Sequence, residues 1–210
     1  MKPLFPTESK LNSERIVLGI DPGTNVLGYG LIAIRGRKVE MLTMGAIDLR
    51  KVGDIYLKLG RIYERILAVI DEFHPDELAI EAPFFGKNVQ SMLKLGRAQG
   101  VVIAAAIARH IPVHEYAPSQ IKQAITGSGA ASKEQVASLM QRTLGISPEA
   151  MLPFLDATDA LAAAYCHHIS TLTRGVKGTI PTATSIQRTA SKGAATWEEF
   201  AKANANRIRK

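Results

Sequence analysis

Four acidic residues stand where a carboxylate needs a charged or hydrogen-bonding partner. Asp21 ends one apolar run and Glu81 ends another, while Asp156 and Asp159 are three residues apart in the stretch DATDALAAA. Residues at this spacing share one face of a helix. Carboxylates in apolar surroundings repel one another unless cations neutralise them, and ligand sets made only of oxygen suit hard ions. The four acids therefore predict a site for Mg²⁺ or Mn²⁺ rather than for Zn²⁺.

A pair of such ions would supply the chemistry of phosphodiester hydrolysis. Two divalent ions about 4 Å apart can activate a water molecule and stabilise the departing oxygen. Taken one at a time, each acid also fits an ordinary role, as a turn or helix cap (Asp21, Glu81), a first-turn charge (Asp159) or a surface acid (Asp156). Their joint occurrence favours a metal-dependent nuclease.

The two acids that end apolar runs are positioned by a predicted β-sheet. The apolar pattern predicts an antiparallel meander of three strands, near residues 16–20, 29–34 and 39–44. An amphipathic helix with Asp54 as its N-cap follows over residues 55–73. A short strand over residues 78–80 then ends at Glu81, so the pattern of Asp21 is repeated.

The second half of the chain is predicted to be mainly helical. Helices are expected over residues 88–110, around Ile121 and Lys122, from 132 to 144 and around 154–168, with one strand at 113–116. Gly96 and Gly100 in the first helix permit close packing. Lys133 lies in the first turn of the helix that begins with the capping box Ser132–Gln135. A basic residue there opposes the helix macrodipole, so Lys133 is expected to meet an anion.

The remaining side chains of metal-ligand type are expected to be structural. The one cysteine, Cys166, excludes a disulfide within the chain and is predicted to be a small buried residue in a reducing cytoplasm. The pair His167-His168 has no second pair of ligands at metal spacing, so it is interpreted as solvated or core histidines without a role.

Charge is divided unevenly along the 210 residues. Residues 1–170 hold 18 Lys and Arg against 17 Asp and Glu, whereas residues 171–210 hold eight against two, so the net charge of +7 lies mostly at the end. We predict a leader over residues 1–14, one nuclease domain over 15–173 and a basic linker with a short helix over 174–210. No apolar run is long enough for a membrane span or a signal peptide, and a cytoplasmic location is expected.

Five motifs resemble the RuvC family of bacterial Holliday-junction resolvases, in order and with matching spacing over about residues 15–170. They are GIDPGTNVLGYG, AIEAPFFGKN, MLKLGRAQG, YAPSQIKQAITGSGAASKEQV and DATDALAAA. The resemblance implies an α/β fold of the RNase H-like type, with a mixed five-stranded sheet flanked by helices, and a homodimer.

The resemblance also implies roles for individual residues. Asp21, Glu81, Asp156 and Asp159 match the family's metal-binding catalytic acids, and Lys122 and Lys133 match its active-site lysines. Phe84 matches an aromatic residue that stacks on a base of the opened junction, and Lys87, Lys94 and Arg97 are further candidate DNA contacts. Two Mg²⁺ ions per subunit are expected, with Mn²⁺ as the other possibility.

The function implied is the resolution of four-way DNA junctions by paired nicks that leave 5′-phosphate and 3′-hydroxyl ends, in cooperation with the RuvA and RuvB branch-migration proteins. Two alternatives remain open from the sequence. One is a junction-binding protein without catalysis. The other is an ATP-binding protein of the group that contains actin, the heat-shock chaperones and the sugar kinases, although that group needs a second related domain and a second phosphate loop.

Overall fold

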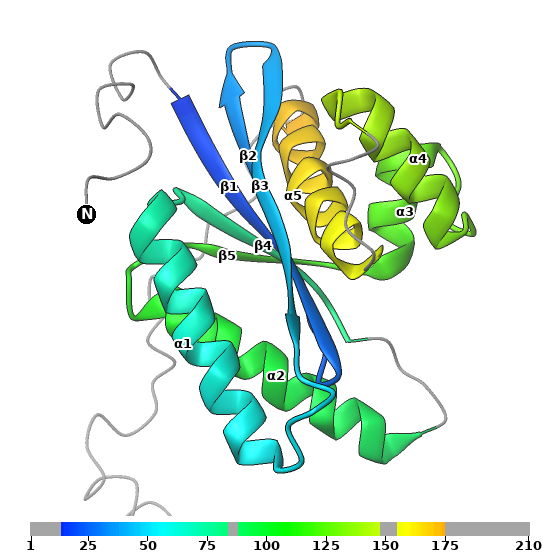
Figure 1. Cartoon of the computed structure of the whole chain (residues 1–210). Helices are drawn as coiled ribbons and strands as arrows, with labels where there is room; N and C mark the ends of the chain where they lie inside the picture. The colour runs from blue at the N-terminus through cyan, green and yellow to red at the C-terminus, as the bar shows by residue number, and fades with distance from the viewer. Residues whose placement is uncertain (1–13, 84–87, 148–154, 175–210) are drawn as a thin grey trace, which may run out of the picture. The chain divides into compact units, whose positions relative to one another are not determined.

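The computed structural model describes residues 14–83, 88–147 and 155–174, and it contains a five-stranded mixed sheet in the order β3-β2-β1-β4-β5 (Figure 1). Strands β1, β2 and β3 form the predicted antiparallel meander. Strand β4 pairs in parallel with β1, and β5 pairs in parallel with β4. The bounds are β1 Glu14–Asp21, β2 Val26–Arg35, β3 Lys38–Asp48, β4 Glu77–Glu81 and β5 Val113–Tyr116.

Five helices cover the two faces of this sheet. Helices α1 and α2 lie on one face, and α5 lies on the other face together with α3 and α4 (Figure 1). The bounds are α1 Ile55–Phe73, α2 Val89–Ile107, α3 Pro118–Thr126, α4 Lys133–Leu144 and α5 Leu155–Arg174. None of the helices in the described residues is long and apolar enough to cross a membrane.

The predicted N-terminal caps of α1 and α4 are confirmed. The Asp54 side chain accepts hydrogen bonds from the first-turn amides of α1, and Ser132 forms a capping box with Gln135 at the start of α4. Gly127 and Gly145 end α3 and α4 with positive φ angles of 77° and 63°, a conformation that glycine adopts without strain. Local sequence chemistry therefore sets the boundaries of the helices that flank the site.

Strand alternation separates two cores and decides which side chains face α5. Leu18 and Ile20 of β1 belong to the core beneath α1 and α2, whereas Val17 belongs to the core beneath α5. In β4, Leu78 and Ile80 join the first core and Ala79 joins the second. Successive side chains of a strand point to opposite faces. Asp21 and Glu81 therefore lie on the same face as α5.

Two glycines in α2, which permit close packing, have no packing partner among the described residues. A Cβ atom added at Gly96 or Gly100 would meet no atom of the described residues within 4 Å. Both glycines lie on the exposed side of α2.

The predicted leader, linker and C-terminal helix lie outside the described residues, apart from Glu14, which begins β1, and Arg174, which ends α5.

Candidate active site

Parallel pairing brings the first two acids to one edge of the sheet. Ile20 of β1 is in register with Ile80 of β4, and each strand continues by one residue, to Asp21 and to Glu81. The carboxyl ends of the two strands therefore coincide. Both carboxylates project toward the layer that contains α5, where Asp156 and Asp159 lie in the first turns of the helix.

Glycines let α5 lie directly against the sheet at this point. Gly28 is opposite Asp21 in the β1–β2 pair, and a Cβ atom added there would lie 1.9 Å from the carbonyl oxygen of Asp156. A Cβ atom at Gly19 would lie 2.0 Å from the carbonyl oxygen of Ala160. Only the absence of a side chain permits such close approach, so these glycines fix the depth at which α5 packs and where its acids stand.

Three of the predicted acids form a compact group of oxygen ligands. One carboxylate oxygen each from Asp21, Asp156 and Asp159 lies within 4.8 Å of the other two. Glu81 is not in this group of three, but its charge acts on Asp21. A donor set of carboxylate oxygens without histidine or cysteine fits a hard divalent cation such as Mg²⁺ or Mn²⁺.

Lys133 lies among these acids. Its Nζ atom is 2.5 Å from Oδ2 of Asp159, 3.4 Å from Oδ1 of Asp156 and 3.9 Å from Oδ2 of Asp21. The anions that offset the unfavourable position of this lysine at the helix start are therefore carboxylates of the same chain. Lys133 is half exposed, so its ammonium also remains accessible to a ligand.

Burial and mutual repulsion raise the pKa values of the acids. Burial, followed by the charge of Glu81, raises the pKa of Asp21 well above its ordinary value. Burial, followed by the charge of Asp159, raises the pKa of Glu81 to about 7. Burial also raises the pKa of Asp159, although Lys133 opposes this change. The site thus disfavours its own negative charge until a cation is supplied.

The surroundings of Lys133 stabilise its protonated form. Burial alone would lower the pKa of this ammonium, but the contact with Asp159 and the charges of Asp21 and Asp156 outweigh that effect, so the pKa is raised. Lys133 therefore stays protonated throughout the range in which proteins function. A fixed cation of this kind is suited to a phosphate oxygen whose negative charge increases during reaction.

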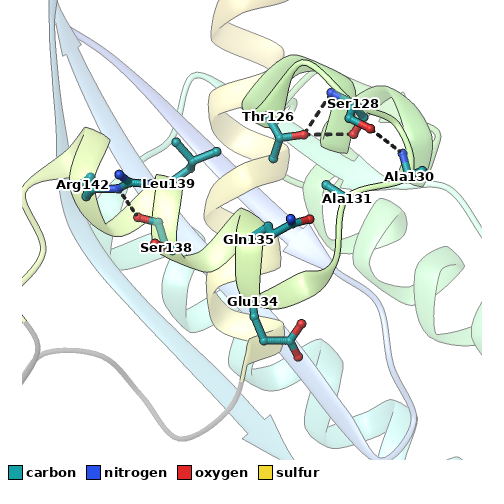
Figure 2. A pocket seen from close by; sticks show the side chains of 9 residues that line it. All are labelled: Thr126, Ser128, Ala130, Ala131, Glu134, Gln135, Ser138, Leu139 and Arg142. Atoms are coloured by element: carbon teal, nitrogen blue, oxygen red, sulfur yellow. Dashed lines mark hydrogen bonds between the residues drawn. The ribbon is translucent and has the colours of Figure 1, made fainter.

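A cleft of about 500 Å³ opens beside the carboxylates, and its lining includes Glu81, Lys122, Lys133 and Asp159. The positive charge of Lys122 lowers the pKa values of Glu81 and Asp159, which places this lysine on the same electrostatic site. A second hollow, of about 550 Å³, lies over α3 and α4 (Figure 2). Glu134 lines that hollow whereas Lys133 lines the cleft, and none of the four acids reaches the second hollow.

The candidate DNA contacts fall elsewhere. Lys94 and Arg97 lie on the exposed side of α2 and do not line the cleft. Phe84 and Lys87, which follow Glu81 in the sequence, lie outside the described residues. The structure therefore brings the four acids and two lysines together and leaves the four other candidates apart from them or undescribed.

The histidine pair is buried as one of the two predicted possibilities, but His167 also has polar partners. His167 and His168 are buried, and Cys166 is buried and free as predicted. However, β4 and β5 bring Glu77 and His114 to His167, so ligand-type atoms of all three lie within 4.8 Å of one another. Spacing along the chain does not reveal this cluster, because its members come from three elements.

The comparisons with known proteins agree with this geometry. A family model described as crossover junction endodeoxyribonuclease RuvC matches residues 17–167. A relative of the same name from Bacteroides fragilis is 55% identical over 196 residues, which cover 93% of this chain and 97% of the relative. Another from Porphyromonas gingivalis is 53% identical over 196 residues, which cover 93% of this chain and 98% of the relative.

Solved structures give the same result for the fold. Thermus thermophilus RuvC in complex with a Holliday junction substrate is 36% identical and has a TM-score of 0.69, with 76% of this chain and 96% of that chain covered. This likeness and the mixed five-stranded sheet confirm the expected RNase H-like fold. With a family model over most of its length and relatives above 50% identity, the chain belongs to the RuvC family of crossover junction endodeoxyribonucleases.

Proposed function

We propose that this chain resolves Holliday junctions in DNA by paired, metal-dependent nicks that leave 5′-phosphate and 3′-hydroxyl ends. The observation that carries the proposal is the group of carboxylate oxygens from Asp21, Asp156 and Asp159, within 4.8 Å of one another and beside a permanently charged lysine. Membership in an endonuclease family favours catalysis over a role in junction binding alone. The Thermus thermophilus relative, solved with a Holliday junction, supports the choice of substrate.

The four acids would hold two divalent ions, Mg²⁺ or Mn²⁺. When bound, such ions supply an activated water and stabilise the departing 3′ oxygen. Asp21 and Glu81 offer ligands from rigid strand ends, and Asp156 and Asp159 offer them from a helix packed against the same strands. Ligands on rigid elements keep their spacing when a charged substrate arrives.

The two lysines would act on the phosphate group. Lys133 carries a fixed positive charge at the edge of the acid group, where an oxygen of the scissile phosphate would accept from its ammonium. Lys122 lines the same cleft from α3. Both would stabilise the negative charge that develops on the phosphate oxygens during attack.

Four other residues would contact the junction away from the reacting phosphate. Phe84 would stack on an exposed base, an interaction worth about 1–3 kcal/mol per base. Lys87 would contact phosphates close to the cleaved strand, and Lys94 and Arg97 would do so from α2. These contacts orient the DNA and take no part in the chemical step.

A homodimer would place two cleavage sites on one junction. Val89, Leu93 and Ile107 are 64%, 56% and 61% exposed on α2, and Gly96 and Gly100 lie between them on the exposed side of the same helix. An apolar stripe with two open glycines suits a second copy of the same helix. Twofold symmetry in the protein would match that of the four-way junction.

RuvA and RuvB would act with the dimer in the cytoplasm.

Incubation of the full chain with a synthetic four-way junction tests this function. The junction is labelled on each strand in turn and compared with a linear duplex of the same sequence, with and without Mg²⁺. We expect symmetrically placed nicks in two strands of the junction, dependent on the metal and sealed by DNA ligase. Equal cleavage of the linear duplex would contradict the proposed selectivity, and ends that ligase cannot seal would contradict the proposed products.

A further inference from the structure

A partly buried chain of hydrogen-bonded polar side chains connects α5 to the sheet at the end remote from the carboxylates. Oε2 of Glu77 accepts hydrogen bonds from Nη2 of Arg15 and from Nε2 of His167, each at 2.5 Å. Nδ1 of His167 is 2.6 Å from the Tyr116 hydroxyl oxygen, and Arg15 also donates from Nη1 to the Thr171 hydroxyl at 3.1 Å. These five residues from β1, β4, β5 and α5 are called here the Glu77–His167 network.

The Glu77–His167 network and the active site lie at opposite ends of β4. Glu77 and Glu81 are four residues apart on one face of β4, about 13 Å at about 3.3 Å per residue. Asp159 and His167 are eight residues apart in α5, about 12 Å at about 1.5 Å per residue. The two elements therefore meet through polar side chains at two matched points, with small residues such as Ala79 and Ala163 packed between.

The pKa of the β4 glutamate is shifted in opposite directions at these two points. At the active site, burial, followed by the charge of Asp159, raises the pKa of Glu81. At the other end, the hydrogen bond from His167, followed by the charge of Arg15, lowers the pKa of Glu77 to about 2 against the cost of burial. A carboxylate only accepts hydrogen bonds, so the contact of 2.5 Å places the shared hydrogen on Nε2 of His167.

Tyr116 connects the active-site end of β4 with the Glu77–His167 network. Its backbone is in register with Glu81, and its carbonyl accepts a hydrogen bond of 2.9 Å from the amide of Ala82. Its side chain is 5% exposed and reaches His167. A displacement of α5 along the sheet would therefore break the contact between Tyr116 and His167 while it moves Asp159 relative to Glu81.

Glu77, His114 and His167 could alternatively bind a metal ion. The ring of His114 stacks on His167 with centroids 4.4 Å apart, and His114, His167 and Glu77 offer ligand-type atoms close together. However, the guanidinium of Arg15 already contacts the same oxygen of Glu77 as His167 does. A positive charge at that oxygen opposes a divalent cation, so hydrogen bonding is the better account of the cluster.

We propose that the Glu77–His167 network is a positioning device for the nuclease reaction: it sets the register of α5 on β4 and β5 and so holds Asp156 and Asp159 at the spacing from Asp21 and Glu81 that a divalent ion requires. The inference rests on the proposed function of the four acids. His167, Tyr116 and Glu77 act through α5 and touch no reacting atom. Helix registration matters because a displacement of about 1 Å in a ligand can cost about 100-fold in rate.

The test compares variants of the full chain in two assays. Tyr116→Phe removes one oxygen, His167→Ala removes the ring, and His167→Gln keeps a donor toward Glu77. Mn²⁺ affinity is measured calorimetrically without DNA, and the cleavage rate is measured with saturating junction. We expect Tyr116→Phe and His167→Ala to weaken Mn²⁺ binding and slow cleavage about 10- to 100-fold, as losses of ligand-orienting partners do. His167→Gln should recover much of both.

The matched control is Val69→Ala, which removes two methyl groups from a side chain that is 1% exposed in the other core, beneath α1 and α2. It should lower the melting temperature without changing Mn²⁺ affinity. The proposal is overturned if Tyr116→Phe and His167→Ala behave like this control, with lower stability but wild-type Mn²⁺ affinity and cleavage. It is also overturned if the wild type binds one equivalent of Zn²⁺ tightly and His167→Ala does not.

The two assays keep the failure of this inference distinct from failure of the proposed function. If the wild type binds Mn²⁺ but cuts no junction, the proposed function fails, and the metal affinities still decide whether the network positions the acids. If the wild type cuts junctions and Tyr116→Phe matches it in both assays, the proposed function stands and the positioning role does not. If His167→Ala fails to fold, Tyr116→Phe decides.

Discussion

At the scale of single residues, Glu81 couples the chemistry of the site to the stability of the fold. Burial and the neighbouring Asp159 raise the pKa of Glu81 to about 7 in the metal-free protein, from an ordinary value near 4.5. An acid whose pKa is raised on folding destabilises the protein once the pH exceeds its unfolded pKa. The cost grows between about pH 4.5 and 7 and is fully present above this window.

We therefore predict that Glu81→Gln abolishes cleavage but stabilises the metal-free protein at neutral and higher pH. In EDTA at pH 8 the melting temperature of the variant should exceed that of the wild type. Near pH 4.5 the difference should nearly vanish, because Glu81 is then protonated in the folded wild type and its folding penalty is small. Thermal denaturation at the two pH values measures this. A difference in melting temperature that does not change with pH would mean that ionisation of Glu81 does not destabilise the folded protein.

The sequence located the candidate acids because their motifs are local. Asp21 and Glu81 each end an apolar run, and Asp156 and Asp159 share a helix face, so no tertiary information was needed to single them out. His167 was missed for the opposite reason. Its partners come from β4 and β5. The similar distances from Glu77 to Glu81 and from His167 to Asp159 have meaning only once the strand and the helix are known to lie together.

At the scale of elements, glycines on the sheet determine where α5 packs. A Cβ atom at Gly28 would lie 1.9 Å from the carbonyl oxygen of Asp156, so α5 must shift to accommodate any side chain there. Gly60, on the exposed side of α1, has no atom of the described residues within 4 Å of an added Cβ atom. The two glycines therefore give opposite expectations for the same substitution.

We predict that Gly28→Ala lowers stability by about 1–3 kcal/mol, the usual cost of overpacking, and weakens Mn²⁺ binding because Asp156 moves. Gly60→Ala should instead raise stability by about 0.5–1 kcal/mol, as alanine does in a helix interior, and leave metal binding unchanged. Denaturant unfolding and calorimetry check both variants. Wild-type metal affinity in Gly28→Ala would show that the depth of α5 does not control the site.

Hydrophobic periodicity predicted the elements, but packing partners needed the structure. The meander, the α1 helix and the capping box at Ser132 all follow from local patterns. The parallel pairing of β1 with β4 joins segments separated by a whole helix, and only the family resemblance implied the mixed sheet. Gly96 and Gly100 illustrate the limit: small residues permit close packing without identifying the partner, and a Cβ atom added at either glycine meets no atom of the described residues within 4 Å.

At the scale of the whole molecule, the apolar stripe on α2 leads to a prediction about assembly. Leu93→Arg should convert the proposed dimer to a monomer, because it places a charge within the stripe. Leu57→Arg on α1 is the matched control, since Leu57 is 65% exposed and Leu93 is 56% exposed. Analytical ultracentrifugation measures the mass, and junction cleavage should change from paired to single nicks. An unchanged mass for Leu93→Arg would place any dimer interface elsewhere.

The C-terminal charge supports a separate prediction about affinity. Residues 171–210 hold eight Lys and Arg against two Asp and Glu, a net charge of +6. Deletion after Thr173 should leave the chemical step intact and lower DNA affinity. The plot of log affinity against log salt should become shallower, because fewer counterions are released. A lowered melting temperature with an unchanged salt slope would instead mean that the segment around Trp197 and Phe200 stabilises the domain.

The proposed reaction requires the four acids to bind the divalent ion that supports cleavage of the junction. Its most direct test is the single-turnover cleavage rate of Asp159→Asn on a four-way junction in Mg²⁺, beside its junction affinity in EDTA. This variant removes a metal ligand and the contact of 2.5 Å with Lys133, and it reduces negative charge near DNA. We predict a rate at least about 100-fold below wild type, with affinity equal or higher. Cleavage by Asp159→Asn at near the wild-type rate, or wild-type cleavage in EDTA, would mean that metal binding by these acids does not drive the reaction.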